Sequence, residues 1–253
     1  MKILVFVSKL TGLKLLDIFF DRYNDDDYLF VVSDPDSEKI IETITMYGHK
    51  YMLLNDSTID WINEKDEKSF DWLLNLWGGY FFKENLISKA KKTLNIHPSF
   101  LPYGRGRDPI VWAIRYGYPA GVTLHEISTS VDDGPILYQE EVNYNFPITG
   151  GQLYNQVIEK CFEVFTNKWP LIRDNNTSAL AQSDKKGYKT FKRKDLYNDN
   201  VINLDNDDMS KDLLLRLLCH DFGDNYSVKL LYKGNKYSLR LLIEKIELEV
   251  DNE

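Results

Sequence analysis

Asn95 and His97 form the first pair of residues whose types and spacing could do chemistry. They lie two positions apart in a short apolar run, so the period-two alternation of a strand sends both side chains to one face, where they can share one substrate. Pro98 and Pro102 then end the strand and stiffen the loop that holds His97. A histidine fixed in this way is a candidate general base, although a lone histidine at a strand end can equally be a core or surface residue.

A second candidate is the loop Ser128 to Pro135, which carries the adjacent carboxylates Asp132 and Asp133. An aspartate shortly before Gly-Pro most often serves only the turn. An aspartate beside a strand-end histidine would instead raise the pKa of that histidine and orient its ring, as a general base working near neutrality requires. The residues alone do not choose between Asp132 and Asp133.

The elements that must position these residues have the rhythm of an α/β protein. Short runs rich in β-branched and aromatic residues alternate with segments whose apolar residues recur every three or four positions. This pattern predicts a Rossmann-like, mostly parallel sheet with crossover helices, in which ligands bind at the carboxyl ends of the strands. The expected strands are 3–7, 28–32, 50–54, 72–77, 93–96, 121–127 and 136–142, and the expected helices are 13–20, 37–47, 83–91, 108–116 and 151–172.

The long helix 151–172 is expected to close a catalytic domain of residues 1–184, followed by a small α+β region over 185–253. In that region the pattern predicts a helix over 210–220 and a β-hairpin of strands 226–232 and 237–250 around Gly234-Asn235. The second strand is the longer, so part of it lacks a partner within the chain. We therefore expect a homodimer built through this hairpin, and the alternative is a monomer in which the extra length packs on the long helix.

Composition limits the class of protein. The 253 residues carry a net charge of -8, and the two cysteines exclude a secreted disulfide framework or a four-cysteine zinc site, so a reducing, cytoplasmic location is expected. The sequence shows no apolar stretch long enough for a membrane span, and the first apolar run is too short for a signal peptide. Residues 185–253 hold 13 basic and 13 acidic residues, which argues against a nucleic-acid partner but leaves a local basic patch open.

An ordered set of residues over positions 95–140 resembles the N10-formyltetrahydrofolate-dependent formyltransferases. Within that family, Tyr103 to Pro109 and Arg193 to Leu196 look most similar to the bacterial sugar N-formyltransferases that act on nucleotide-linked amino sugars. The resemblance weakens before residue 70 and again in the C-terminal region. The residues that carry it are Asn95-x-His97-Pro98-Ser99-x-Leu101-Pro102, Arg105-Gly106, Pro109, Trp112-Ala113, Gly121-Val122-Thr123, His125 and Val131-Asp132-x-Gly134-Pro135-Ile136.

The resemblance implies that Asn95, His97 and Asp132 are the catalytic residues, and it places Asp132 rather than Asp133 at the family's aspartate. It implies that His97 takes a proton from an attacking amine, that Asp132 orients the imidazolium, and that Asn95 donates to the developing oxyanion. It also implies N10-formyltetrahydrofolate as formyl donor, no metal, and an acceptor amine on C3 or C4 of a dideoxy sugar linked to a nucleotide such as dTDP. Such products serve O-antigen or other surface polysaccharide synthesis. A cis Leu101-Pro102 bond is a further expectation from the family.

The same resemblance suggests contacts for the two substrates. The pterin ring is expected against residues 77–80 and residues 128–131. The rival interpretation of Gly78-Gly79 in the first loop is an ordinary turn between strand and helix. Phosphate contacts are expected from Lys9 and Arg105, with the loop 8–12 before a helix N-terminus. Arg107 can alternatively pair with Asp108 or Asp133. His125 is expected to be a supporting or core histidine, and no functional role is expected for His49 or His220. The folate candidates are Trp77, Gly78, Gly79 and Tyr80, and Ser128, Thr129, Ser130 and Val131.

Other functions remain as alternatives. Formylation of Met-tRNA is disfavoured by the neutral C-terminal region, and formylation of glycinamide ribonucleotide by the absence of a glycine-rich phosphate loop. A formyltetrahydrofolate hydrolase would use the same three residues and is not excluded. Outside the enzymes, a noncatalytic nucleotide-sugar binding module would not need the Asn, His and Asp set. A zinc deacylase is disfavoured because the four scattered histidines offer no ligand spacing.

Overall fold

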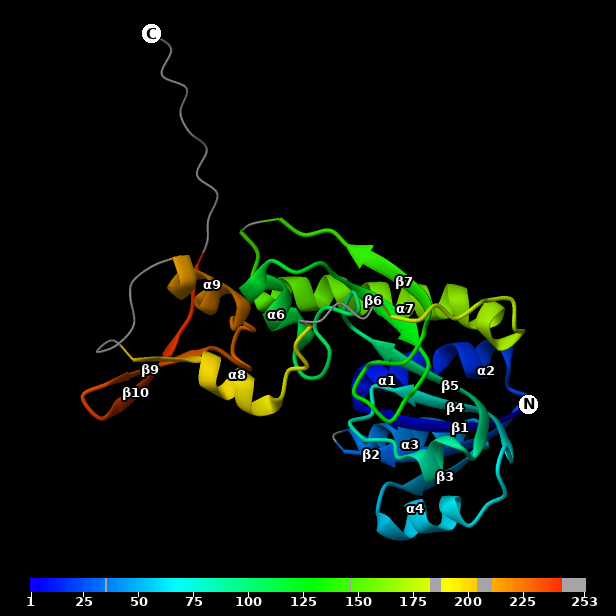
Figure 1. The fold of residues 1–253 in the computed structure, drawn as a ribbon. Coiled ribbons are helices and arrows are strands. Elements are labelled where there is room, and N and C mark those ends of the chain that lie inside the picture. The colour runs from blue at the N-terminus through cyan, green and yellow to red at the C-terminus, as the bar shows by residue number, and fades with distance from the viewer. Residues whose placement is uncertain (35, 146, 183–187, 204–210, 243–253) are drawn as a thin grey trace.

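The computed structural model describes residues 1–34, 36–145, 147–182, 188–203 and 211–242. A sheet of seven strands in the order β3-β2-β1-β4-β5-β6-β7 forms its centre, and a separate sheet has the order β10-β9-β8. Figure 1 shows the second sheet beyond α6, at the opposite end from β2 and β3. The elements up to residue 173 are β1 (Lys2–Ser8), α1 (Lys9–Leu15), α2 (Asp17–Arg22), β2 (Asp27–Ser33), α3 (Ser37–Met46), β3 (Lys50–Leu53), α4 (Asp56–Asn63), β4 (Phe70–Leu76), α5 (Glu84–Ile87), β5 (Ala90–His97), α6 (Pro109–Tyr116), β6 (Ala120–His125), β7 (Ile136–Val142) and α7 (Gly150–Arg173).

The central sheet is mostly parallel, as the sequence pattern predicts. Strands β1 to β5 run parallel to one another, whereas β6 is antiparallel to β5 and β7 is antiparallel to β6. In this register Asn95 of β5 lies opposite Asn75 of β4 on one side and His125 of β6 on the other. Three neighbouring strands therefore present polar side chains at the same place in the sheet.

Helices cover both faces of this sheet, and β1 shows why its sequence is almost continuously apolar. Ile3, Val5 and Val7 pack into a core cluster that includes residues of α1, α2, α3, α6 and α7. Leu4 and Phe6 point to the other face, into a cluster with residues of α4 and α5. A strand buried on both faces is a rigid support, so its end can hold a functional group in a fixed position.

The C-terminal region contains α8 (Arg193–Asp199), β8 (Val201–Asn203), α9 (Lys211–Cys219), β9 (Val228–Tyr232) and β10 (Asn235–Leu239). Helix α9 packs against α6 and α7. Phe191, just before α8, stacks on Trp112 of α6 with ring centroids 4.2 Å apart. Aromatic stacking and helix packing thus dock this region beside the loop that follows β5.

The hairpin is present but shorter than expected. Strand β10 ends at Leu239, and all five of its residues pair with the five residues of β9. Residues 240–242 form no strand, and the remainder of the expected strand, 243–250, lies outside the described residues. The prediction of strand length without an intrachain partner is therefore wrong for the described part of the hairpin.

Several other boundaries differ from the sequence prediction. The expected helix 13–20 is two helices, and α1 begins at Lys9 directly after β1, so there is no loop over 8–12. The chain turns at once because the Ser8 hydroxyl donates to the Trp77 carbonyl at 2.6 Å and Lys9 adopts a positive φ of 61°. Helix α4, whose first turn is capped by the Asn55 side chain, was not predicted, nor were α8 and β8. None of the helices within the described part of the chain is long and apolar enough to cross a membrane.

Candidate active site

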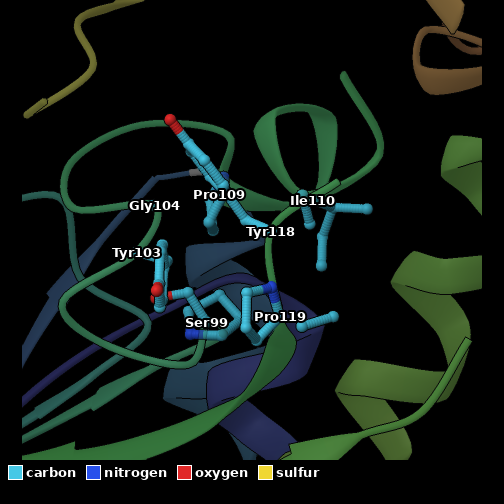
Figure 2. A pocket seen from close by; sticks show the side chains of 10 residues that line it. Ser99, Tyr103, Gly104, Pro109, Ile110, Tyr118 and Pro119 are labelled. Carbon is cyan, nitrogen blue, oxygen red and sulfur yellow. The ribbon is translucent and has the colours of Figure 1, made fainter. Parts of the chain in front are cut away.

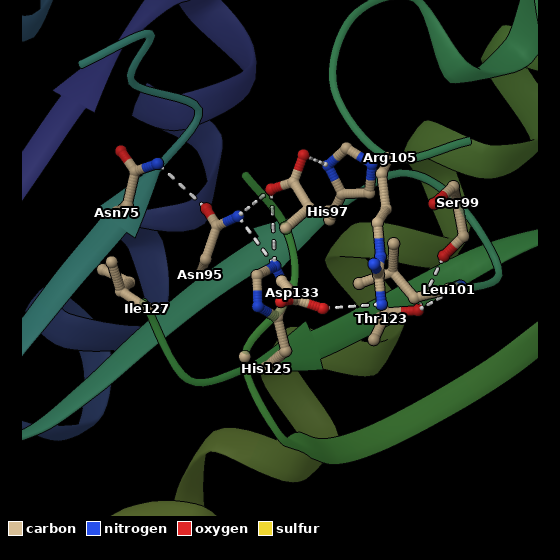
Figure 3. Close-up of polar contacts among 12 residues, drawn as sticks. Asn75, Asn95, His97, Ser99, Leu101, Arg105, Thr123, His125, Ile127 and Asp133 are labelled. Atoms are coloured by element: carbon tan, nitrogen blue, oxygen red, sulfur yellow. Dashed lines mark hydrogen bonds and ion pairs between the residues drawn. The ribbon is translucent and has the colours of Figure 1, made fainter. Parts of the chain in front are cut away.

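Asn95 and His97 lie at the carboxyl end of β5 with their side chains on the same face of the strand (Figure 3). The His97 ring is buried, with a residue exposure of 6%. Its Nε2 lies 3.0 Å from the Gly104 carbonyl oxygen, and its Nδ1 lies 3.6 Å from Oδ2 of Asp132. Because a carbonyl oxygen only accepts, Nε2 carries the hydrogen, and Nδ1 is the nitrogen that can take up a proton.

Asp132 joins the other two residues. Its Oδ1 accepts a hydrogen bond from Nδ2 of Asn95 at 3.2 Å, and its Oδ2 accepts from the Gly106 backbone N–H at 2.8 Å. Burial by itself would raise the pKa of Asp132, but the neighbouring His97 and His125 and the Gly106 N–H outweigh burial and hold this pKa well below its usual range. The carboxylate is therefore charged across the neutral pH range and available to stabilise an imidazolium.

The amide of Asn95 is held by three partners. Its Oδ1 accepts from Nδ2 of Asn75 at 2.9 Å, while its own Nδ2 faces Asp132 and, at 3.0 Å, Nε2 of His125. The Nδ1 of His125 lies 2.8 Å from the Glu126 carbonyl, which fixes a hydrogen on that nitrogen and leaves Nε2 as the acceptor. His125 is buried and thus supports Asn95 and Asp132 from the neighbouring strand β6.

The loop after His97 is fastened to β6 and β7. The Thr123 hydroxyl donates to the Ser99 carbonyl at 2.7 Å and accepts from the Leu101 N–H at 3.1 Å. The Gln139 side-chain amide donates to the Leu101 carbonyl at 2.7 Å. The Leu101-Pro102 peptide bond is cis, which confirms the expectation. These contacts hold the loop that carries Gly104, the partner of His97.

Asp133 points away from the histidine. Its carboxylate pairs with Arg105 at 2.8 Å, and Figure 3 shows this pair beside the other polar contacts. The Gln182 side chain accepts from the same guanidinium at 2.6 Å and donates to the carbonyls of Asp132 and Gly134, both at 2.9 Å. Arg105, the expected phosphate contact, is thus held by two protein partners, and Gln182 locks the loop that contains Asp132.

A group of exposed cations lies close by. Lys9 begins α1, Arg107 follows Arg105 in the loop after β5, and Arg193 begins α8. Burial and the nearby Arg107 lower the pKa of Lys9, and Arg193 acts in the same direction, whereas Asp108 opposes them. Within the described residues, no ion pair joins Arg107 to Asp108 or Asp133. Three cationic side chains from separate segments therefore lie near one another, with Asp108 and Asp36 as the anions that act on Lys9.

The two expected folate loops follow strands on either side of β5. Trp77 to Tyr80 come directly after β4, and Ser128 to Val131 follow β6. The Tyr80 ring faces inward, stacked on Phe6 with centroids 5.5 Å apart. Thr129, Ser130 and Val131 are exposed. Because β6 is antiparallel to β5, the second loop leaves β6 beside Thr93, where the Ile127 N–H donates to the Thr93 hydroxyl at 2.8 Å. Asp132, after this loop, returns to Asn95 and His97.

A small pocket is lined by residues of the loop after β5, of α6 and of the segment that leads into β6 (Figure 2). None of Asn95, His97 and Asp132 lines it. The buried Ser99 hydroxyl, which is among the lining groups, has no hydrogen-bond partner in the described part of the chain. The pocket is therefore separate from the cluster of Asn95, His97 and Asp132. Its lining residues are Pro98, Ser99, Tyr103, Gly104, Pro109, Ile110, Ala113, Tyr118, Pro119 and Ala120.

One group in the described residues has donor atoms close enough for a metal: Asp199, Cys219 and His220. It lies in the C-terminal region, and its carboxylate is already matched by Arg115 at 3.2 Å and by Nε2 of His220 at 3.1 Å. This group is therefore an ion-pair network that fastens α8 to α6 and α9. It shares no residue with the cluster around His97.

Two residues of the site were not predicted from sequence. Asn75 lies in a strand whose other residues are mainly apolar, and that contrast was the available signal. Gln182 lies in a polar stretch after α7, and nothing in the sequence of that stretch distinguishes it. Both act through hydrogen bonds to segments distant in sequence.

Part of the chain is similar in sequence to known proteins. Residues 79–167 match the model of the formyl transferase family. Over 133 residues the chain is 32% identical to the dTDP-4-amino-4,6-dideoxyglucose formyltransferase of Mycobacterium tuberculosis, and the match covers 50% of this chain and 56% of that protein. The match therefore spans only about half the length of this relative.

Solved structures extend the likeness in fold to nearly the whole chain. A 4-N formyltransferase from Francisella tularensis superposes with a TM-score of 0.81 at 24% identity, covering 97% of this chain and 98% of that one. An N-formyltransferase from Helicobacter canadensis, in complex with folinic acid and dTDP-3-aminofucose, gives a TM-score of 0.72 at 19% identity and covers 93% and 86%. At these identities the likeness shows a shared fold. Asn95, His97 and Asp132 all lie inside residues 79–167, the part of the chain that matches the formyl transferase family model.

Proposed function

We propose that this protein is a sugar N-formyltransferase that moves the formyl group of N10-formyltetrahydrofolate to the amine of a nucleotide-linked amino sugar. The observation that carries the proposal is the position of the Asp132 carboxylate, which touches both the Nδ2 of Asn95 and, at 3.6 Å, the Nδ1 of His97. One anion thereby orients a hydrogen-bond donor and a proton acceptor at the end of a buried strand.

In the proposed reaction the sugar amine attacks the formyl carbon and a new C–N bond forms. The amine proton passes to Nδ1 of His97, and Asp132 stabilises the imidazolium that results. The Asn95 amide donates to the oxygen as it becomes an oxyanion. The intermediate then collapses, the bond between the formyl carbon and N10 breaks, and N10 takes up the proton. Metal chemistry is not part of this proposal.

Two further assignments complete the substrate sites. We place the pterin of the donor between residues 77–80, which follow β4, and residues 128–131, which follow β6. We place the diphosphate of the nucleotide sugar near Lys9 and Arg105, the original candidates, with Arg107 and Arg193 as added cations. A dTDP-linked 3-amino or 4-amino dideoxy sugar fits the substrates named for the relatives. We assign the activity to the cytoplasm and to the synthesis of O-antigen or another surface polysaccharide.

We also propose a homodimer through the C-terminal hairpin. Exposed apolar side chains on and beside the hairpin support this proposal, because an apolar surface of this kind favours contact with another chain. The side chains are those of Leu231, Tyr232, Tyr237 and Leu242, and all four residues are at least 46% exposed. A variant that combines Tyr232→Asp and Tyr237→Asp should be monomeric by light scattering at concentrations where the unchanged chain is dimeric. A monomeric unchanged chain at micromolar concentration would overturn this proposal.

The function is tested by incubating the protein with N10-formyltetrahydrofolate and a panel of nucleotide-linked 3-amino and 4-amino sugars, and weighing the products. We expect one sugar to gain one formyl group, and His97→Ala to lose roughly a hundredfold or more of the rate while the fold is retained. Formate release without an acceptor would favour the hydrolase. A stable unconverted complex with the sugar would favour a binding module, and formylation of Met-tRNA would favour that acceptor.

A further inference from the structure

We propose that Asn75 is a positioning residue that sets the orientation of the Asn95 amide and ties it to the turn after β4. This inference rests on the proposed function, because it assumes that Asn95 serves the formyl oxygen. Asn75 lies in β4, directly opposite Asn95 in the register of β4 and β5, and it is buried, with a residue exposure of 8%. It touches none of the reacting atoms in the proposed mechanism.

The side-chain NH2 of Asn75 makes two hydrogen bonds. One goes to Oδ1 of Asn95 at 2.9 Å and the other to the Gly78 carbonyl at 3.2 Å. An amide nitrogen has two hydrogens, so these bonds use its full donor capacity. Figure 3 shows Asn75 and Asn95 joined side chain to side chain on adjacent strands. A single group thus connects the candidate oxyanion donor with the turn that we assign to the folate.

The orientation matters because the two ends of an amide are chemically opposite. With Oδ1 turned toward Asn75, the NH2 of Asn95 faces Asp132 and His125, on the side where the formyl oxygen would lie. The reverse orientation would place an oxygen there, which repels an oxyanion instead of stabilising it. Oδ1 of Asn95 needs a hydrogen-bond donor, and the NH2 of Asn75 is the donor that faces it. Asn75 therefore favours this orientation of the Asn95 amide over the reverse one.

Close packing explains why this position is occupied by an amide beside a glycine. Oδ1 of Asn75 has no hydrogen-bond partner in the described part of the chain, and it lies 2.4 Å from where a Cβ on Gly78 would be. Any side chain at position 78 would displace the Asn75 amide. A buried oxygen without a hydrogen-bond partner lowers the free energy of unfolding by about 1–3 kcal/mol, so this geometry is kept at a loss of stability. The turn and the amide are therefore positioned as one unit.

A double-mutant cycle gives the first test. Asn75→Ala should lower kcat by roughly tenfold to a hundredfold, the range expected when a reacting group is misplaced by a fraction of an ångström to an ångström. In an Asn95→Ala background the same change should alter kcat by no more than about threefold, because no amide remains to be oriented. Effects that multiply independently would overturn the inference and assign Asn75 a purely structural role.

The variant Asn75→Asp gives the second test, with nearly the same shape. A carboxylate cannot donate, so it would face two acceptors, and Asn95 should rotate to turn its NH2 toward position 75. We expect kcat to fall by roughly a hundredfold to a thousandfold at pH 8, the loss typical of a removed oxyanion donor. Burial raises the pKa of such a carboxyl, and its protonated form can donate again. The ratio of variant to unchanged kcat should therefore rise as the pH falls from 8 to 6.

The matched control is Asn63→Asp at the end of α4, where the amide oxygen is likewise buried without a partner in the described residues. Its kcat should stay within about twofold of the unchanged protein at every pH. The amide orientation is read separately from a high-resolution crystal structure of Asn75→Asp at pH 8. If the unchanged protein formylates nothing, the proposed function fails, while this structure still decides the inference. An Asn95 amide that keeps its orientation there would overturn it.

Discussion

Replacing Asp132 by asparagine changes one charged oxygen of the site into an amide nitrogen and leaves the side-chain volume nearly the same. In the structure Oδ2 of Asp132 faces Nδ1 of His97 at 3.6 Å, and Oδ1 accepts from Asn95. In Asp132→Asn no negative charge remains to stabilise an imidazolium. One of its two polar atoms must also become a donor that faces another donor, either Nδ2 of Asn95 or the Gly106 N–H.

The size of the effect follows from the distance. A unit charge pair 3.6 Å apart interacts by about 4–5 kcal/mol at an effective dielectric constant of about 20. Each 1.36 kcal/mol changes a rate by about tenfold. If the imidazolium is fully formed in the transition state, Asp132→Asn should lower kcat by about a thousandfold. A partly formed charge would give a smaller loss, down to about a hundredfold.

The assay is formyl transfer to the acceptor sugar under saturating donor, with thermal unfolding measured on the same samples. Asp133→Asn is the matched control, because the same change is made one residue along the chain. Asp133 pairs with Arg105 at 2.8 Å and its side chain is 44% exposed, so this variant should keep its kcat within a few-fold. If Asp133→Asn is the inactive enzyme and Asp132→Asn the active one, the electrostatic reasoning is wrong.

Four further outcomes are expected. Gln182→Glu keeps an acceptor for Arg105 but cannot donate to the Asp132 carbonyl, so kcat should fall about tenfold and denaturant titration should show a loss of about 1–3 kcal/mol. Gly106→Ala would place a Cβ 2.2 Å from the Phe191 carbonyl at a φ of +87°, and it should lose both activity and stability. Gly117→Ala, with a φ of +66° and open space, should show only the backbone strain of about 1–3 kcal/mol, and thermal unfolding with activity assays separates the two. The pKa of Asp132 is lower in the folded protein than in the unfolded chain, where it is about 3.9, so the charged carboxylate stabilises the fold above that pH and this stabilisation is lost as the pH falls further. The difference in unfolding free energy between the unchanged protein and Asp132→Asn should therefore shrink below about pH 4.

The part of the site that depends on the alternation of side chains along a strand could be predicted from sequence. The spacing of Asn95 and His97 predicts a shared face, and the structure has them on one face of β5. The choice of Asp132 over Asp133 came from the family resemblance, because both lie in one turn and only the backbone conformation decides their directions. Asp132 has a φ of 49°, which turns its side chain toward the histidine, and no local pattern encodes that.

Contacts between distant segments could not be predicted in this way. Asn75 meets Asn95 through the register of two strands, and Gln182 reaches Asp132 from the connection after α7. A single sequence shows neither the register nor the return of the chain. Helix α4 was missed because it is short, and its Asn55 cap gives only a local signal. The mostly parallel sheet was predicted correctly, since apolar runs alternating with amphipathic helices leave few other folds.

Both hydrogens on Nδ2 of Asn95 are already engaged, by His125 at 3.0 Å and by the Asp132 carboxylate at 3.2 Å. An incoming carbonyl oxygen must therefore compete with an internal anion for a hydrogen. A neutral formyl oxygen is a weaker acceptor than a carboxylate and gains little by the exchange, whereas an oxygen that is becoming charged competes on equal terms. If Asn95 serves this oxygen, its N–H stays bonded to the internal partner while the substrate is neutral and bonds the substrate oxygen only as negative charge grows there. The site then stabilises the transition state more than the ground state through an exchange of hydrogen-bond partners.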